Sequence, residues 1–173
     1  MFSKRILYGS SLVLALGILG IASAVPSLAQ TPPIAVELLT PRSVITDDVS
    51  GQIKIKHHGG GTDVINMNDL SRTVVARITV QPGAQFPWHT HAGPVIVNVA
   101  EGALVFVGAD DCTEANYVAG EAFVDAGHGH VHTAFNRLSA PTVLYATFLQ
   151  VPASGPLTIT EGITAPTDCQ ITP

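Results

Sequence analysis

From Thr73 onward the chain is a succession of short runs of β-prone residues, each ended by turn residues such as Gln81-Pro82-Gly83. The runs recur at roughly the 8–12-residue spacing that is typical of sandwiches and barrels. Outside the N-terminal segment we find no helical periodicity longer than two turns. The sequence therefore predicts an all-β domain with strands near 73–80, 95–99, 103–107, 117–118, 122–124, 131–135, 142–151 and 157–160.

Ahead of these runs, residues 30–50 form a lead that contains Pro and Thr, with 34–39 as an expected edge strand. Residues 52–56 alternate polar and apolar side chains, as a half-exposed strand does. His57 and His58 precede three glycines, and we interpret them as a solvated pair in a loop; a second metal site is the alternative.

Residues 1–29 resemble a secretory signal peptide. Lys4 and Arg5 give the basic start, residues 12–22 are apolar, and Ser27-Leu28-Ala29 is a small-x-small cleavage site. Cleavage after Ala24 and an uncleaved anchor are the alternatives, although the apolar stretch is short for a membrane span. We expect a mature chain of 30–173, secreted or periplasmic, with no stable membrane span.

Charge argues against a nucleic-acid partner. Eight basic and thirteen acidic residues occur in the chain, and two of the basic ones belong to the predicted signal. The mature chain would carry a net charge of −7, without a run of Lys or Arg that could bind a polyanion. The 46% of hydrophobic residues is enough for a sizeable core.

The chain has two cysteines, Cys112 and Cys169. An even number of cysteines in an exported protein favours a disulfide. The alternative is two unrelated thiols. The spacing is not Cys-x-x-Cys, so a redox-active pair is not indicated.

Five of the seven histidines lie in two short windows, Pro87–His91 and His128–His132. Alternate residues of a strand point to the same face, so His89 and His91 project together. An imidazole from a neighbouring strand, such as that of His132, would complete one face of a metal's coordination sphere. Imidazole ligands suit zinc, copper, iron and nickel, and also serve manganese.

These windows resemble the two motifs of the cupin superfamily. The first motif is a glycine, five residues, His-x-His, three or four residues, Glu, six residues and a glycine. It is matched here from Gly83 through His89 and His91 to Gly102. The second motif is matched, with one extra residue, from Gly120 through His132 to Asn136. The resemblance implies an all-β double-stranded β-helix, or jelly-roll barrel, with a metal site in its mouth.

Two positions depart from the cupin pattern. Gly127 stands where the second motif usually has proline, which alters only a turn. Val95 stands where the usual glutamate ligand would be. Either Val95 leaves an open coordination site, or a turn rotates it outward and another side chain, for which Gln85 is a candidate, takes the glutamate's place.

The resemblance implies one divalent ion (Fe, Mn, Cu, Ni or Zn) held by His89, His91 and His132, as in cupin dioxygenases that use three histidines and no glutamate. Three neutral imidazoles leave the ion its full +2 charge, which favours anionic or bidentate oxygen ligands. We expect an exported, dioxygenase-like oxidoreductase that acts on a small oxygen-rich molecule. A non-enzymatic cupin that binds a metal or small ligand is the alternative; whether the protein is catalytic, and whether it forms a homodimer, stay open.

His130 is the best candidate for a catalytic residue. It has the same strand parity as His132 and could line the pocket or shuttle a proton. The alternative is that the strand twists it toward solvent.

Overall fold

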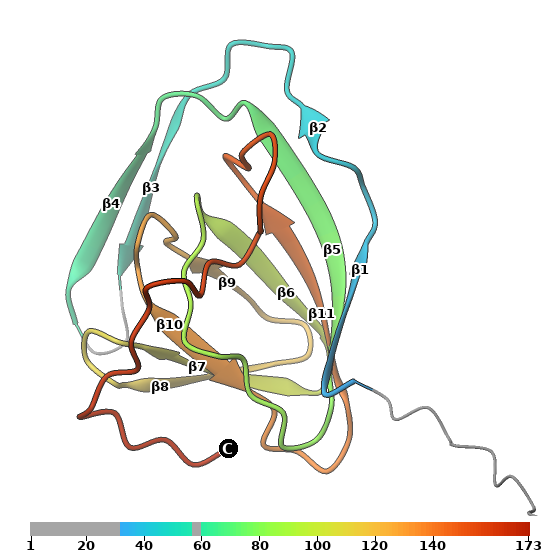
Figure 1. Ribbon diagram of the computed structural model, residues 1–173, viewed down its shortest axis with the longest axis vertical. Helices are drawn as coiled ribbons and strands as arrows, with labels where there is room; N and C mark the ends of the chain where they lie inside the picture. The colour runs from blue at the N-terminus through green and yellow to red at the C-terminus, as the bar shows by residue number, and fades with distance from the viewer. Residues whose placement is uncertain (1–31, 57–59) are drawn as a thin grey trace, which may run out of the picture. The chain divides into compact units, whose positions relative to one another are not determined.

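The computed structural model describes residues 32–56 and 60–173, and its strands are those drawn in Figure 1. The predicted signal peptide and the histidine pair His57-His58 lie outside these residues. Within the described part of the chain, no helix has the length and apolar character needed to cross a membrane.

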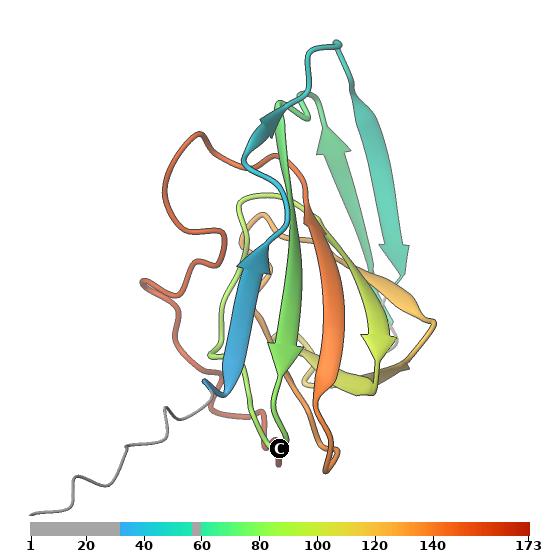
Figure 2. The ribbon, with the colours of Figure 1, turned by 90° about the vertical axis from the view of Figure 1, so that its right-hand side faces the viewer.

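The larger sheet is antiparallel and has the order β1-β5-β11-β6-β9. Its strands are Ile34–Leu38, Arg72–Val80, Thr142–Phe148, Val95–Glu101 and Ala122–Asp125 in that order. The short β2 (Ser43–Val44) also pairs with β5. Figure 2 shows β1, β5, β11 and β6 side by side, with β1 at the sheet's edge as predicted.

The smaller sheet has the order β10-β7-β8, formed by His132–Phe135, Ala103–Gly108 and Glu114–Val118. Residues 83–89 run along the free side of β10. The amides of Phe86 and His89 donate to the carbonyls of Ala134 and His132, each at 2.9 Å. This segment therefore acts as a fourth strand of the smaller sheet.

The chain alternates between the two sheets in the order of a jelly roll. It passes from β5 to residues 83–89 in the other sheet, returns to β6, and makes the β7–β8 hairpin in the smaller sheet. It then visits β9, β10 and β11, which lie in the larger, smaller and larger sheets. The predicted all-β double-stranded β-helix is confirmed.

Strict alternation of buried and half-buried residues builds the core. In β5, Val74, Ala76, Ile78 and Val80 are buried, and the residues between them are less so. They join one apolar cluster with residues of both sheets, including Leu104 of β7. Burying a Val, Ile or Leu side chain contributes roughly 1.5–3 kcal/mol to folding, so the two sheets are held face to face.

A hairpin of β3 (Gly51–Lys56) and β4 (Thr62–Met67) stands outside the two sheets. Ile65 and Met67 of this hairpin pack against Ala126, which follows β9. The sequence pattern predicted β3 but not β4, in which Asp63 and Asn66 flank the adjacent apolar residues Val64 and Ile65 and break the alternation.

Two C-terminal expectations had different outcomes. The predicted strand 157–160 is wrong: only a single bridge, between Ile159 and Thr90, occurs there. The predicted disulfide is confirmed, since Cys112 and Cys169 are bonded with their Cα atoms 5.1 Å apart. The bond holds the C-terminal tail beside the loop that joins β7 and β8.

Candidate metal centre

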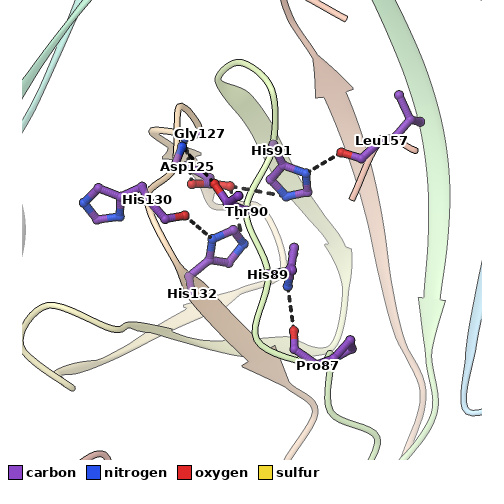
Figure 3. A network of polar contacts seen from close by, with 10 residues as sticks. Pro87, His89, Thr90, His91, Asp125, Gly127, His130, His132 and Leu157 are labelled. Carbon is purple, nitrogen blue, oxygen red and sulfur yellow. Dashed lines mark hydrogen bonds and ion pairs between the residues drawn. The ribbon is translucent and has the colours of Figure 1, made fainter. Parts of the chain in front are cut away.

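The three predicted histidines converge inside the barrel. His89 and His91 lie on the segment that leads into β6, and His132 begins β10. Backbone hydrogen bonds of 2.9 Å in both directions join His89 to His132 and fix the register of the two segments. One ligand nitrogen from each ring lies within 4.8 Å of the others, and all three residues are buried. Figure 3 shows the three rings facing one region.

Backbone carbonyls select the tautomer of these rings. Nδ1 of His89 lies 2.7 Å from the Pro87 carbonyl oxygen, and Nδ1 of His91 lies 2.8 Å from that of Leu157. Nδ1 of His132 makes a longer contact, 3.4 Å, with the carbonyl oxygen of His130. Since a carbonyl only accepts, the short contacts of His89 and His91 favour the tautomer with the hydrogen on Nδ1, which leaves the Nε2 lone pairs facing the interior.

Burial keeps the rings neutral. Desolvation lowers the pKa of His91 to about 4, although the nearby Asp125 carboxylate opposes the shift. Desolvation and the neighbouring His89 lower the pKa of His132 to about 3. The pKa of His89 is lowered by the same loss of water. Neutral imidazole is the form that binds a metal, because the protonated ring has no free lone pair.

A small chamber of about 60 Å³ lies against the three rings. Phe106 stacks on His132 with ring centroids 4.9 Å apart, and Phe148 meets His91 edge-on at 5.4 Å. Most of the remaining wall is apolar and comes from both sheets: Ile78, Phe86, Val95, Val97, Leu104, Phe123, Ala134, Leu144 and Ala146. Such a wall shields the histidines from water.

Val95 faces this chamber and is 2% exposed, so it is not rotated outward. Gln85 does not take the glutamate's place, because its side-chain amide donates instead to the hydroxyl of Thr133 at 3.2 Å. The carboxylate in the chamber belongs to Asp125, the cross-strand partner of Val95 in the β6–β9 pair.

Asp125 is 2% exposed and has two different oxygen environments. Its Oδ1 accepts the amide of Gly127 at 3.1 Å. Its Oδ2 lies 3.3 Å from Nε2 of His91 and 3.4 Å from Nε2 of His132. Among the described residues, Oδ2 is the one buried side-chain nitrogen or oxygen with no hydrogen-bond partner. Desolvation raises the pKa of this carboxyl group.

His130 does not point at the three rings (Figure 3). Its Nε2 lies 2.9 Å from Oδ2 of Asp63 and 3.0 Å from Oδ2 of Asp110. These groups line a second, larger cavity of about 260 Å³ between the β3–β4 hairpin and the smaller sheet. Phe106, Phe123 and Asp125 line both cavities, so they form the partition between the chamber and this outer cavity.

The donor set fits a divalent transition metal. Three neutral Nε2 lone pairs and a buried carboxylate oxygen are ligands that zinc, iron and copper accept. The Nδ1 atoms of the three rings face backbone carbonyls, as is usual for ligating histidines. His89, His91 and His132 could therefore hold one ion in the chamber.

Sequence reasoning missed Asp125. Its signal was a carboxylate at the end of the apolar run 122–124, with the same parity as the buried Phe123. It was uninformative without knowing that β9 pairs with β6, which places position 125 directly opposite position 95.

The solved structures that match this chain include several cupins. A sugar phosphate isomerase of the cupin superfamily from Silicibacter pomeroyi is 32% identical over 47% of this chain and 53% of its own, with a TM-score of 0.41. A polyketide cyclase from Streptomyces resistomycificus is 18% identical over 54% of this chain and 63% of its own, with a TM-score of 0.44. The cupin domain of a transcriptional regulator from Enterobacter cloacae is 17% identical over 70% of this chain and 99% of its own, with a TM-score of 0.46.

The chain thus spans less than two thirds of the cyclase and of the isomerase. No protein-family model and no curated protein matches the sequence. Since the TM-scores lie below 0.5, the strand order, together with the two histidine motifs, carries the fold assignment.

Proposed function

We propose that this protein binds one divalent transition metal through His89, His91 and His132 and is a metal-dependent, dioxygenase-like oxidoreductase. The supporting observation is the convergence of three buried Nε2 atoms whose Nδ1 atoms face backbone carbonyls. A buried histidine that served only packing would not need its lone pair aimed at two others. The ion, when bound, would polarise a substrate oxygen and, if redox-active, would support O₂ chemistry.

The two cavities suggest how a small molecule is bound. The inner chamber, about 60 Å³, has room only for a small group, whereas the outer cavity, about 260 Å³, holds the body of a small molecule. We infer that an oxygen-bearing end enters the chamber past Phe106 and Phe123. The apolar wall then excludes water from the reacting end.

His130 is the proposed proton carrier of the outer cavity. Its Nε2 lies between two carboxylate oxygens, and its backbone carbonyl contacts Nδ1 of His132. A substrate in the outer cavity would lie beside this ring, which could give or take a proton there. His130 is assigned no contact with the metal.

We further propose that residues 1–29 are a signal peptide removed before Gln30 and that the protein is secreted or periplasmic. The disulfide between Cys112 and Cys169 supports an oxidising compartment. Mass spectrometry of protein recovered from its native compartment tests the cleavage site. An intact Met1 in the membrane fraction would overturn the proposed location.

Metal analysis of that natively exported protein is the first test of function, with about one equivalent of a transition metal expected. Oxygen uptake by iron- or copper-loaded protein with β-diketones, flavonols and hydroxy acids then tests the oxidoreductase proposal. The second candidate, a non-enzymatic binding module, is favoured by the apolar walls of the chamber. Stoichiometric metal without turnover of any of these compounds would support that second candidate.

A further inference from the structure

Asp125 has no role in a site made of three histidines alone. Its side chain is only 2% exposed. Its Oδ2 faces Nε2 of both His91 and His132 and has no hydrogen-bond partner among the described residues. A buried carboxylate without a partner is costly, so its retention at this place requires a compensating group.

We propose that Asp125 is the fourth protein ligand of the metal and supplies, from β9, the carboxylate that position 95 lacks on β6. This proposal rests on the proposed function, because it requires an ion at the three histidines. Residues paired across antiparallel strands present their side chains to the same face. Asp125 therefore enters the chamber beside Val95. The carboxylate ligand that the cupin pattern places on β6 comes here from the neighbouring strand, β9.

The distances agree with shared coordination. Two ligands that each lie about 2.1 Å from a metal are about 3.0 Å apart at a right angle and about 3.4 Å apart at the tetrahedral angle. The two observed separations from Oδ2 to the Nε2 atoms, 3.3 and 3.4 Å, lie within this interval.

The protonation pattern points the same way. The Leu157 carbonyl favours the tautomer of His91 with its hydrogen on Nδ1, so that Nε2 presents a lone pair to Oδ2, and the longer contact of His132 with the His130 carbonyl favours the same arrangement. Lone pairs that face a carboxylate repel it. A cation between them turns each of these contacts into an attraction.

Gly127 is a positioning residue for this carboxylate. Its amide holds Oδ1, which leaves Oδ2 directed at the rings. Its φ is +60°, and a Cβ there would lie 2.1 Å from the carbonyl oxygen of Gly93. A larger residue would displace this turn and with it the orientation of Asp125.

A fourth, anionic ligand changes the class of substrate. Three histidines leave a divalent ion with a charge of +2, whereas adding Asp125 reduces it to +1. No Lys or Arg lines the chamber in the described part of the chain. The site then suits a neutral or singly charged molecule, and it disfavours a dianion.

Zn²⁺ affinity, measured by competition with a chelator, tests this proposal. Asp125→Asn keeps an oxygen for the Gly127 amide and removes the charge, so binding should weaken by at least about 100-fold, beyond the 10–100-fold that supporting residues cost. The metal-free variant should melt no lower than wild type. Asp48→Asn, a matched loss of one exposed negative charge, should bind like wild type.

A rescue distinguishes a ligand from a packing residue. Asp125→Val should abolish tight binding, and adding Val95→Glu to that variant should recover at least tenfold of the loss. Wild-type affinity in both Asp125→Asn and Asp125→Val would overturn the proposal while leaving the three-histidine site intact. A wild-type protein that binds no Zn²⁺ would overturn the proposed function itself.

Discussion

Two histidine–carboxylate groups lie on opposite sides of one partition, and they differ in their access to water. In the inner group, the side chains of His91, His132 and Asp125 are only 8%, 5% and 2% exposed. In the outer group, His130 is 18% exposed and its partners Asp63 and Asp110 are 34% and 72% exposed. The ring-to-carboxylate distances are similar, at 2.9–3.0 Å outside and 3.3–3.4 Å inside.

Burial gives these similar groups different chemistry. In the outer group, water reaches the ring and both carboxylates, so solvent can compensate their charges. In the inner group, desolvation lowers the pKa of His91 and His132 and raises that of Asp125. The inner group therefore lacks a positive charge that protons do not readily supply, and a metal would supply it.

Removing one inner histidine should have the largest effect. His132→Ala takes away an Nε2 ligand, and we expect Zn²⁺ affinity to fall by more than about 100-fold, measured by chelator competition. His130→Ala is the matched variant in the outer group and should change the affinity by less than about threefold. Equal losses in the two variants would show that the metal lies between the two groups rather than in the chamber.

Loss of the disulfide should act on the outer group and spare the inner one. Cys112 lies two residues from Asp110, and its bond closes a separation of 57 residues. The chain-entropy account gives such a bond about 4 kcal/mol. The double variant Cys112→Ser/Cys169→Ser should lose most of this free energy of unfolding in urea, with its Zn²⁺ affinity unchanged. A large fall in affinity would mean that the tail supports the chamber.

Val95→Glu adds a second carboxylate to the inner group. A further anionic ligand should tighten Zn²⁺ binding by about tenfold or more, roughly 1.4 kcal/mol, because it repays its desolvation by coordinating the ion. The same change should lower the stability of the metal-free protein, since two buried carboxylates would then face each other. It should also weaken any anionic substrate. Val95→Gln controls for size; if its affinity matches that of Val95→Glu, charge is not the cause.

The smallest effect is expected in the outer group. Asp110→Asn removes an exposed partner of His130, and exposed ion pairs contribute about 0–1 kcal/mol. Thermal melting of the metal-free protein should therefore shift by only a few degrees at most. A loss comparable to that of the disulfide would show that the outer group is a structural clamp.

The barrel was predictable from local patterns. The alternation in Thr73–Val80 and the turn at Gln81-Pro82-Gly83 depend only on neighbouring residues, and β5 runs from Arg72 to Val80. The strand 157–160 was predicted wrongly because β-propensity does not reveal whether a partner strand is available. The segment pairs with the rest of the chain only through the bridge between Ile159 and Thr90, among the described residues.

The site was predictable in part. His-x-His on a strand, with a third histidine at motif spacing, was enough to anticipate that His89, His91 and His132 converge. Asp125 depends on the pairing of two strands that are separated in the sequence by residues 102–121. The orientation of His130 depends on Asp63, which lies on a strand that the sequence analysis did not predict.

The central claim is that an ion sits in the chamber between the three Nε2 atoms. The direct test is a crystal of the Zn²⁺-loaded protein measured on both sides of the zinc absorption edge. The account predicts one anomalous peak about 2.0–2.1 Å from Nε2 of His89, His91 and His132. A peak beside His130 and Asp63 would contradict it. So would a crystal without a peak if the same protein binds one equivalent of zinc in solution.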